Sequence, residues 1–279
     1  MIQDIAPYKL YNEYRPQAKP EDESRVLCCF EKYVLIRLKT EEKSAEFPRL
    51  SELPVIDPEE LVYAFSVDET PYFLYIGKEQ QKADAYEYAN IHNIRHLLSN
   101  VFGMIIYTGI HLHHWYNSSK FCGCCGQKLQ HSKRERAMCC PDCGKTFYPR
   151  LNPAVIVGVT DGDKILVTKY KSGFAHFALV AGFTEIGETL EETVMREVME
   201  ETGLCVKNIR YYKSQPWGMA DDILVGFYCD VDGDRTIRID EQELKIAEWK
   251  ERAEIELQPD DYSLTNEMMQ CFKENKEIK

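Results

Sequence analysis

The sequence lacks an apolar run long enough to cross a membrane. Its longest apolar stretch, residues 101–110, has about half the length that a transmembrane helix needs. The first residues of the chain also lack the basic segment followed by an apolar segment that is typical of a secretory signal. From these absences we expect a cytoplasmic protein with no membrane partner.

Basic residues, glycine and proline are also scarce. The 34 Lys and Arg are outnumbered by 46 Asp and Glu, so the formal net charge is −12. Non-specific binding to nucleic acids or anionic membranes needs the opposite balance. With 15 Gly and 12 Pro in 279 residues, the chain is not of low complexity, and its 44% hydrophobic content argues against disorder. A chain of this length forms about two domains.

Cysteine, in contrast, is plentiful, with eleven in the chain and six between residues 122 and 143. Two Cys-x-x-Cys units stand there, Cys122 with Cys125 and Cys140 with Cys143. A glycine follows each unit, and glycine tolerates the positive φ that a zinc knuckle often requires. Two such turns can present four thiolates in the tetrahedron that suits Zn²⁺. We expect one structural zinc ion per chain, because a site closed by four cysteines has no open position for catalysis.

Redox thiols or a disulfide pair are the alternative interpretation of the same cysteines. Cys124 and Cys139 are interpreted as thiols beside the zinc site, and the five remaining cysteines as small buried apolar residues. Three histidines, His111, His113 and His114, could form a second metal site, but their place in a predicted helix favours a packing or surface role.

The pattern of apolar residues predicts an α+β fold. Strands are predicted at 26–38, 61–67, 71–77 and 224–231, with a hairpin at 152–170 around an Asp-Gly-Asp turn, and residues 177–188 are predicted to be a strand followed by a glycine-bearing loop. Helices are predicted at 83–118, as one helix or two, and at 189–203 and 262–275. We divide the chain into an N-terminal α+β domain (1–119), a four-cysteine zinc ribbon (120–150) and a catalytic domain (151–279).

Residues 182–204 carry the densest group of acidic side chains. Glu197, Glu200 and Glu201 fall on one turn of the predicted helix, and Arg196 is spaced to orient Glu200 through a charge-assisted hydrogen bond. The apolar positions of the other face are Leu190, Val194 and Val198. A solvated acidic helix would explain the glutamates alone. The glycines at both ends of the segment argue against this explanation. Carboxylates on one helical turn repel one another unless a cation is bound, and their oxygen ligands select Mg²⁺ or Mn²⁺.

This segment resembles the Nudix box, whose specified positions are all filled. They are Gly182, Glu188, Arg196, Glu197, Val198, Glu200, Glu201, Gly203 and Leu204. The resemblance implies an α/β/α sandwich with the box as a loop-helix-loop, and hydrolysis of a nucleoside diphosphate linked to another moiety. It also implies catalytic roles for Glu197, Glu200 and Glu201. The Mg²⁺ or Mn²⁺ ligands that it implies are Glu197, Glu201, Glu243 and the carbonyl of Ala181.

A zinc ribbon before a Nudix domain, with a strand-rich and Nudix-like domain before both, resembles the NADH pyrophosphatase (NAD⁺ diphosphatase) family. The family motif SQPWPFPxS is half present, since the chain reads SQPWGMADD from Ser214 to Asp222. The resemblance implies substrate contacts for Arg95, Glu135, Tyr148, Gln215, Pro216, Trp217 and Thr265, where Thr265 replaces the family's usual Ala.

The expected function is divalent-metal-dependent hydrolysis of NADH or NAD⁺ at the pyrophosphate, giving AMP and the (reduced) nicotinamide mononucleotide. The family resemblance also suggests a homodimer. Three alternatives stay open: another substrate such as ADP-ribose or FAD, removal of NAD caps from RNA, and a non-catalytic nucleotide sensor. The basic residues Lys128, Lys133, Arg134 and Arg136 on the ribbon are the only modest cluster that would suit an RNA substrate.

Overall fold

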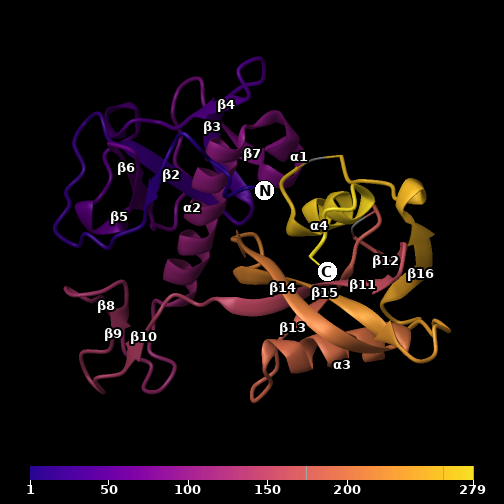
Figure 1. Ribbon diagram of the computed structural model, residues 1–279. Coiled ribbons are helices and arrows are strands. Elements are labelled where there is room, and N and C mark those ends of the chain that lie inside the picture. Colours follow the sequence, from indigo (N-terminus) through magenta and orange to yellow (C-terminus); the bar gives the residue numbers. More distant parts are fainter. Residues whose placement is uncertain (174, 260, 279) are drawn as a thin grey trace. The chain divides into compact units, whose positions relative to one another are not determined.

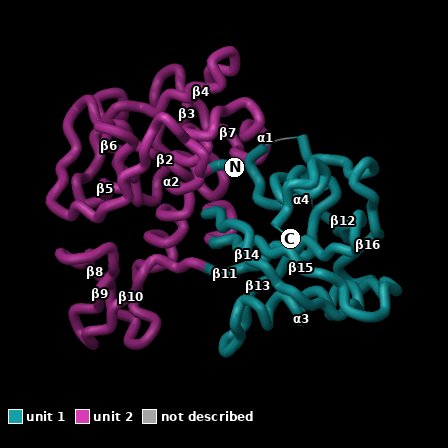
Figure 2. The backbone as a smooth tube through the Cα atoms, in the orientation of Figure 1, with its two compact units in different colours: residues 1–2, 152–217, 222–279 teal, residues 3–151, 218–221 magenta. Residues whose placement is uncertain are grey.

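The computed structural model describes residues 1–173, 175–259 and 261–278 (Figure 1). The chain separates into two compact units (Figure 2). The C-terminal unit comprises residues 1–2, 152–217 and 222–279, and the N-terminal unit comprises residues 3–151 and 218–221. In the described residues no helix is both long and apolar enough to span a membrane.

The N-terminal unit contains a seven-stranded sheet with the order β1-β5-β6-β2-β3-β4, and β7 pairs with β3. Its strands are β1 (Leu10–Tyr11), β2 (Arg25–Phe30), β3 (Tyr33–Lys39), β4 (Ser44–Glu46), β5 (Leu61–Val67), β6 (Thr70–Tyr75) and β7 (Glu87–Asn90). Its helices are α1 (Ile91–Ile94), α2 (Asn100–Ser118) and the short 3-10 helices η1 (Leu50–Glu52), η2 (Pro58–Glu60) and η3 (Arg95–Leu97). Ile105, Ile106 and Ile110 bury one face of α2.

Two predictions for this unit were wrong in detail. The strand predicted at 26–38 is two strands, because the chain turns back at Glu31, whose φ is +50°. The helix predicted at 83–118 begins too early, since residues 87–90 pair with β3 as strand β7. Asn90 then caps the short α1 by accepting a hydrogen bond from the His92 amide, and the long helix starts only at Asn100.

The cysteine-rich segment forms a three-stranded sheet with the order β10-β9-β8. Its strands are β8 (Gln130–His131), β9 (Met138–Cys139) and β10 (Thr146–Phe147). This ribbon belongs to the same compact unit as the N-terminal strands. Arg136 donates a hydrogen bond of 2.7 Å to the Ala64 carbonyl, and the Tyr14 hydroxyl donates one of 2.7 Å to the Ser132 carbonyl. The predicted boundary between residues 119 and 120 stays a prediction.

The C-terminal unit is a sandwich of one sheet between two helices (Figure 1). The sheet has the order β14-β15-β11-β12-β16, with β13 paired to β11, and only β11 and β15 run parallel. The strands are β11 (Asn152–Asp161), β12 (Lys164–Tyr170), β13 (Val180–Phe183), β14 (Cys205–Trp217), β15 (Asp222–Asp232) and β16 (Leu244–Glu251). The helices are α3 (Leu190–Thr202), α4 (Leu264–Lys273) and the 3-10 helix η4 (Arg252–Glu254). The predicted hairpin and the α3 and α4 helices are confirmed within a few residues.

Each face of this sheet has its own core. Residues such as Val155, Leu166 and Val198 pack together on the α3 side. Ile165 and Phe272 belong to the separate core on the α4 side. The alternation of neighbouring strand residues between the two cores follows from the period of two in a strand. The α/β/α sandwich and the α+β class that the sequence predicted are therefore confirmed.

Candidate functional site

The α3 helix is closed at both ends by its own sequence. At the start, the Thr189 hydroxyl accepts a hydrogen bond from the Glu192 amide, and the Glu192 carboxylate accepts one from the Thr189 amide. At the end, Gly203 has a φ of +70°, a left-handed conformation that favours glycine. Both ends of the helix lie where the box motif predicted, so the acidic residues keep a fixed position on its surface.

Gly182 lets the helix approach strand β13. A Cβ atom at this position would lie 1.9 Å from the carboxyl carbon of Glu197. The carboxylate of Glu197 therefore occupies the space that any other residue at 182 would fill. Arg196 holds the same carboxylate from the helix side, with 2.8 Å between its Nη1 and the Glu197 Oε1. The same Nη1 lies 3.0 Å from Oε2 of Glu200, so the predicted pairing of Arg196 with Glu200 is confirmed.

Glu201 is the most deeply buried acid of the helix, with 3% of its surface exposed. Its Oε2 atom is buried and has no hydrogen-bond partner among the residues that the structure describes. Burial, and then the nearby carboxylates of Glu197 and Glu243, raise the pKa of Glu201 to about 8, and a hydrogen bond from the Ala181 backbone opposes this rise. Burial also raises the pKa of Glu197. A buried carboxylate oxygen without a partner, among like charges, fits a divalent cation bound by oxygen ligands.

These carboxylates do not form a tight cluster by themselves. Within the described ranges, only the four predicted cysteines bring three or more His, Cys, Asp or Glu ligand atoms within 4.8 Å of one another. Glu200 points outward, with 59% of its side chain exposed, and Glu243 is exposed where the loop enters β16. Repulsion between carboxylates favours such spreading. The metal-binding roles predicted for Ala181, Glu197, Glu201 and Glu243 stay predictions.

Tyr170 and Asp240 are two neighbours of these acids that motif analysis missed. The Asp240 amide donates a hydrogen bond of 2.9 Å to the Glu201 carbonyl, and its carboxylate contributes to the raised pKa of Glu201. Burial, and then the charges of Glu201 and Glu243, raise the pKa of Tyr170. Neither residue belongs to the box motif. Tyr170 ends strand β12, which pairs with β16, and Asp240 lies in the loop before β16.

The predicted zinc knuckles are two copies of one turn. In each, the amide of the glycine donates to the carbonyl of the first cysteine: Gly126 to Cys122 at 2.8 Å and Gly144 to Cys140 at 3.1 Å. The φ angles of the two glycines are +76° and +72°, as the zinc-knuckle interpretation predicted. An amide of each turn also lies 3.4 Å from the first sulfur, from Cys124 in one turn and from Cys143 in the other.

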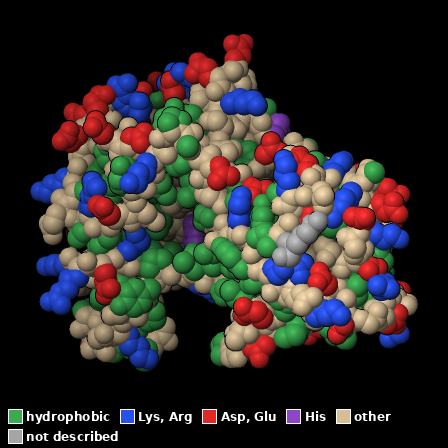
Figure 3. All heavy atoms as spheres, in the orientation of Figure 1, with side chains coloured by type: hydrophobic (Ala, Val, Ile, Leu, Met, Phe, Trp, Pro, Cys, Tyr) green, Lys and Arg blue, Asp and Glu red, His purple; other side chains and the backbone are tan. Residues whose placement is uncertain are grey.

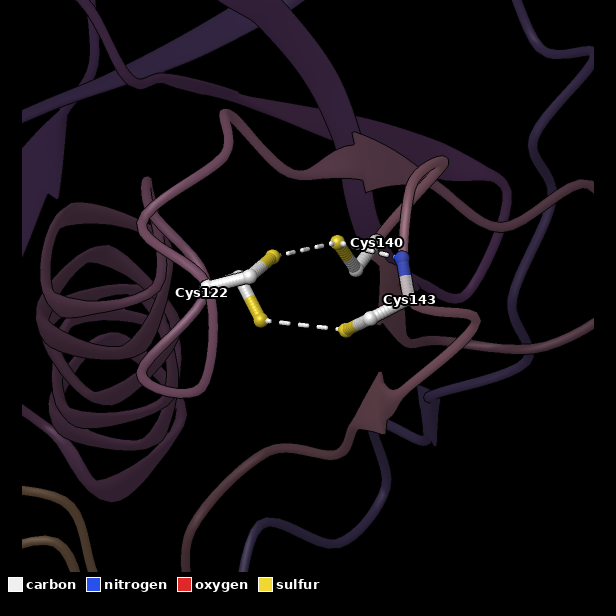
Figure 4. A group of neighbouring side chains, drawn as sticks. Cys122, Cys140 and Cys143 are labelled. Carbon is white, nitrogen blue, oxygen red and sulfur yellow. Dashed lines mark hydrogen bonds between the residues drawn. The ribbon is translucent and has the colours of Figure 1, made fainter.

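The two turns bring their sulfurs together (Figure 4). The Sγ atoms of Cys122 and Cys143 lie 3.6 Å apart, and those of Cys125 and Cys140 lie 3.5 Å apart. All four cysteines are free thiols. Four sulfurs around zinc at ~2.3 Å would be ~3.8 Å from one another, so the arrangement fits Zn²⁺. Backbone amides hold the pKa of Cys122 at about 6, below its ordinary value, which favours the thiolate that zinc binds.

The residues predicted to contact substrate fall in both units. In the N-terminal unit, Arg95 starts η3, and the Tyr148 hydroxyl donates a hydrogen bond of 3.0 Å to the exposed Glu135 carboxylate. In the C-terminal unit, Pro216 and Trp217 end β14, and Thr265 lies half-exposed in the first turn of α4.

Gln215 has a structural role in its own unit. Its side chain is fully buried, donates a hydrogen bond of 2.6 Å to the Tyr262 carbonyl and accepts one of 2.7 Å from the Leu264 amide. This side chain therefore fastens the start of α4 to β14. Gln215 thus lies next to the first turn of α4, which carries Thr265, and its side-chain amide is hydrogen-bonded within the protein.

The histidines of α2 make structural contacts, as predicted. Nδ1 of His114 lies 3.0 Å from Oδ1 of Asp221, and Nε2 of His111 lies 2.8 Å from the Arg150 carbonyl. His113 is buried, and burial lowers its pKa to about 4. Asp221 belongs to the short segment 218–221 of the N-terminal unit, where the chain departs from the family motif.

Comparison with known proteins identifies the domain that contains the box. Residues 150–270 match the NUDIX domain. The chain is 38% identical over 174 residues to the NAD-capped RNA hydrolase NudC of Haemophilus influenzae (strain PittEE), covering 61% of this chain and 65% of that protein. It is 45% identical over 145 residues to the NAD-capped RNA hydrolase NudC of Klebsiella pneumoniae (strain 342), covering 50% of this chain and 55% of that protein. The matches thus span between half and just under two thirds of these relatives.

A solved NUDIX hydrolase from Nitrosomonas europaea shares 21% sequence identity with the chain. The superposition covers 56% of this chain and 91% of that one, with a TM-score of 0.48. The sequence match and the box geometry agree: residues 150–270 form a NUDIX domain, and the chain is similar to the NudC proteins over this part of its length.

Proposed function

We propose that the protein hydrolyses the pyrophosphate of NADH or NAD⁺, with Mg²⁺ or Mn²⁺ as cofactor. One observation carries the proposal: the partnerless oxygen of the buried Glu201 lies among like charges on the NUDIX helix. Water adds to one phosphorus and the bridging P–O bond breaks, so that AMP and the (reduced) nicotinamide mononucleotide are released. The similarity to proteins named as hydrolases of NAD-capped RNA supports a dinucleotide substrate.

Different side chains have different roles in the proposed reaction. A bound divalent ion would neutralise pyrophosphate oxygens and lower the pKa of a water molecule. Glu197, Glu201 and Glu243, with the Ala181 carbonyl, would hold the ion. Glu200 would assist from its position beside Arg196, which keeps the Glu197 carboxylate oriented. The burial of Glu201 excludes water from its carboxylate, which strengthens its attraction for a cation.

The ribbon would hold one structural Zn²⁺ through Cys122, Cys125, Cys140 and Cys143. The convergence of the four sulfurs supports this assignment. Cytoplasmic location and assembly as a homodimer also belong to the proposal, and sedimentation would test the dimer.

Removal of NAD caps from RNA is the second candidate function, and the charge of the ribbon favours it. Residues 120–150 contain seven Lys or Arg against two Asp or Glu, whereas acids predominate in the chain as a whole. Figure 3 shows Lys and Arg side chains at the ribbon, on the lower left. A basic surface of this kind suits the phosphates of RNA. ADP-ribose and FAD are further candidate substrates, and the altered sequence after Trp217 is the reason to include them.

The test is a substrate panel with product separation. The protein is incubated with Mg²⁺ and NADH, NAD⁺, ADP-ribose, FAD or an NAD-capped RNA oligonucleotide, in separate reactions. Fastest release of AMP and reduced nicotinamide mononucleotide from NADH supports the proposal, and faster ADP-ribose or FAD cleavage reassigns the substrate. If every compound stays intact with Mg²⁺ or Mn²⁺ present, the non-catalytic sensor replaces the enzyme. The Glu201→Gln variant is the negative control.

A further inference from the structure

The N-terminal unit contains a cavity of about 670 Å³ that the proposed function does not use, and all of its lining residues belong to that unit. The cavity lies beside strands β3 and β7, which pair with each other (Figure 1). The loop before β7 and the residues at the end of η1 complete the lining. Small-molecule sites in proteins typically have a volume of roughly 300–1,000 Å³, so the cavity is large enough for an organic ligand.

One part of the lining is apolar. Leu35 and Leu53 line the cavity and belong to a buried core of this unit. Tyr86 and Tyr88 also line it, and both are partly buried against the same core. Burial raises the pKa of Tyr88, so its hydroxyl is neutral at physiological pH. The cavity therefore offers a ligand apolar surface and two uncharged aromatic side chains.

The charged part of the lining is mainly acidic. Glu52, Asp84 and Glu87 contribute three carboxylates and Lys82 contributes one ammonium group, which gives a formal charge of −2. This excess attracts cations and repels anions. A nucleotide, whose phosphates are negatively charged, therefore fits this cavity poorly.

Hydrogen bonds hold the Glu52 carboxylate in one orientation. Its Oε2 atom accepts a hydrogen bond of 2.8 Å from the Arg49 amide and one of 3.0 Å from the Tyr86 hydroxyl. The contact with the amide is the largest cause of the lowered pKa of Glu52, so the carboxylate is ionised at neutral pH. Both bonds use the same oxygen, and the Oε1 atom can accept a hydrogen bond from a ligand.

Tyr86 is itself held by a residue outside the lining. Nη2 of Arg37 donates a hydrogen bond of 3.2 Å to the Tyr86 hydroxyl, and the guanidinium carbon lies 4.9 Å from the centre of the ring. The same Nη2 lies 3.0 Å from Oε2 of Glu46, so Arg37 is paired with a carboxylate that does not line the cavity. Contacts from Arg37 through Tyr86 to Glu52 thus fix one ring and one carboxylate of the lining. Such preorganisation lowers the free-energy cost of binding a ligand.

We propose that this cavity binds an organic cation, meaning a protonated amine or a quaternary ammonium group on an apolar or aromatic body. The cationic nitrogen lies against Glu52, and the charges of Asp84 and Glu87 add to the attraction. The apolar body covers Leu53 and the tyrosine rings, whose faces also attract cations. The site belongs to the N-terminal unit and does not depend on the proposed hydrolysis.

The test uses the whole protein and small aromatic probes, with excess Mg²⁺ present to occupy the carboxylates of the NUDIX helix. Benzylamine and benzyltrimethylammonium are the cations, benzyl alcohol is the neutral analogue and phenylacetate is the anion. Saturation-transfer NMR detects binding, and calorimetric titration gives each Kd. We expect both cations to bind roughly 10-fold more tightly than benzyl alcohol, and phenylacetate to bind most weakly.

Three variants locate the binding site. Glu52→Gln removes the charge but keeps an acceptor for the Arg49 amide and the Tyr86 hydroxyl, and it should weaken binding of both cations roughly 10-fold while the Kd of benzyl alcohol stays unchanged. Lys82→Gln removes the ammonium group of the lining and should strengthen binding of the cations. The matched control is Glu69→Gln, which removes an equal charge from the exposed turn between β5 and β6. Thermal unfolding of each variant verifies that it is folded.

Several results would overturn the proposal. They are equal affinity for benzylamine and benzyl alcohol, tighter binding of phenylacetate than of the cations, the absence of binding by every probe, and equal effects of Glu52→Gln and Glu69→Gln. If Glu52→Gln does not fold, the ranking of the probes and the effect of Lys82→Gln still decide. None of these measurements uses NADH, so a failure of the proposed hydrolysis is recognised separately. NADH turnover of Glu52→Gln, measured in parallel, should equal that of the wild type.

Discussion

Arg196 binds the carboxylate of Glu188 with two nearly parallel hydrogen bonds, from Nε to Oε1 at 2.6 Å and from Nη2 to Oε2 at 2.9 Å. The same guanidinium donates to the Phe183 carbonyl at 2.8 Å. One side chain of α3 thus ties together the loop before the helix and the end of β13. Since only arginine has this planar fork, lysine cannot replace it.

The Glu188 contact makes stability depend on pH in the acid range. The hydrogen bonds from Arg196 are the largest cause that lowers the pKa of Glu188 to about 2, from an ordinary 4.5. A group with a lowered pKa stabilises the fold above its unfolded pKa, and this contribution is lost as the pH falls from 4.5 to about 2. In urea unfolding, Glu188→Gln should therefore be less stable than wild type at pH 6, and the difference should shrink toward pH 2. A difference that does not change with pH would contradict the pairing, and Glu191→Gln in the exposed first turn is the control.

Gly182→Ala should damage the carboxylate site without unfolding the sandwich. The added methyl group would need the space of the Glu197 carboxyl group, 1.9 Å away, so Glu197 must rotate out. We expect Mn²⁺ affinity and turnover to fall by roughly 10-fold or more, as when an oriented ligand is lost. The control is Gly123→Ala, where an added Cβ meets open space. Unchanged Mn²⁺ affinity in Gly182→Ala would show that Glu197 does not need this position.

Removal of zinc should unfold the ribbon and spare the NUDIX sheet. Cys125→Ser takes away one of the four converging sulfurs, and the bound zinc measured by atomic absorption should fall from one per chain to near zero. Cys124→Ser changes the neighbouring exposed cysteine and should keep its zinc. Equal zinc content in both variants would contradict the assignment of ligands.

Restoring the family's proline at position 218 should destabilise the protein. A Cβ at Gly218 would lie 2.1 Å from the Tyr107 carbonyl oxygen, and the Tyr107 backbone in α2 cannot move away easily. Gly218→Ala and Gly218→Pro should lower the free energy of unfolding by about 1–3 kcal/mol, as overpacking typically does. Ala220→Ser, at an exposed position of the same segment, should be neutral in chemical denaturation. Wild-type stability in Gly218→Pro would mean that this segment adapts to larger residues.

Motifs in the sequence predicted those parts of the structure that are formed by residues close together in the chain. The capped α3 helix and the two zinc turns are formed by residues only a few positions apart, so their spacing is visible in the chain. The helix predicted from residue 83 failed because β7 is formed by pairing with β3, about fifty residues away. Asp240 was missed for the same reason, since only folding brings the loop before β16 to the end of α3.

Gln215 illustrates a different limit. A motif marks a residue as important and does not say whether it contacts substrate or supports the fold. Gln215 donates a hydrogen bond to the Tyr262 carbonyl and accepts one from the Leu264 amide at the start of α4, and neither could be foreseen because both partners are more than forty residues away in the sequence. Only the folded arrangement distinguishes the two roles.

The repetition of one turn in the ribbon has a consequence for how this segment tolerates change. Each Cys-x-x-Cys turn is closed by hydrogen bonds among its own few residues, so the chain between the two turns needs only to bring them together. Lengthening a flexible connection twofold costs only about 0.6 kcal/mol. The exposed bend at Lys133–Glu135, between β8 and β9, is therefore a place where extra residues can be inserted while both halves keep their geometry.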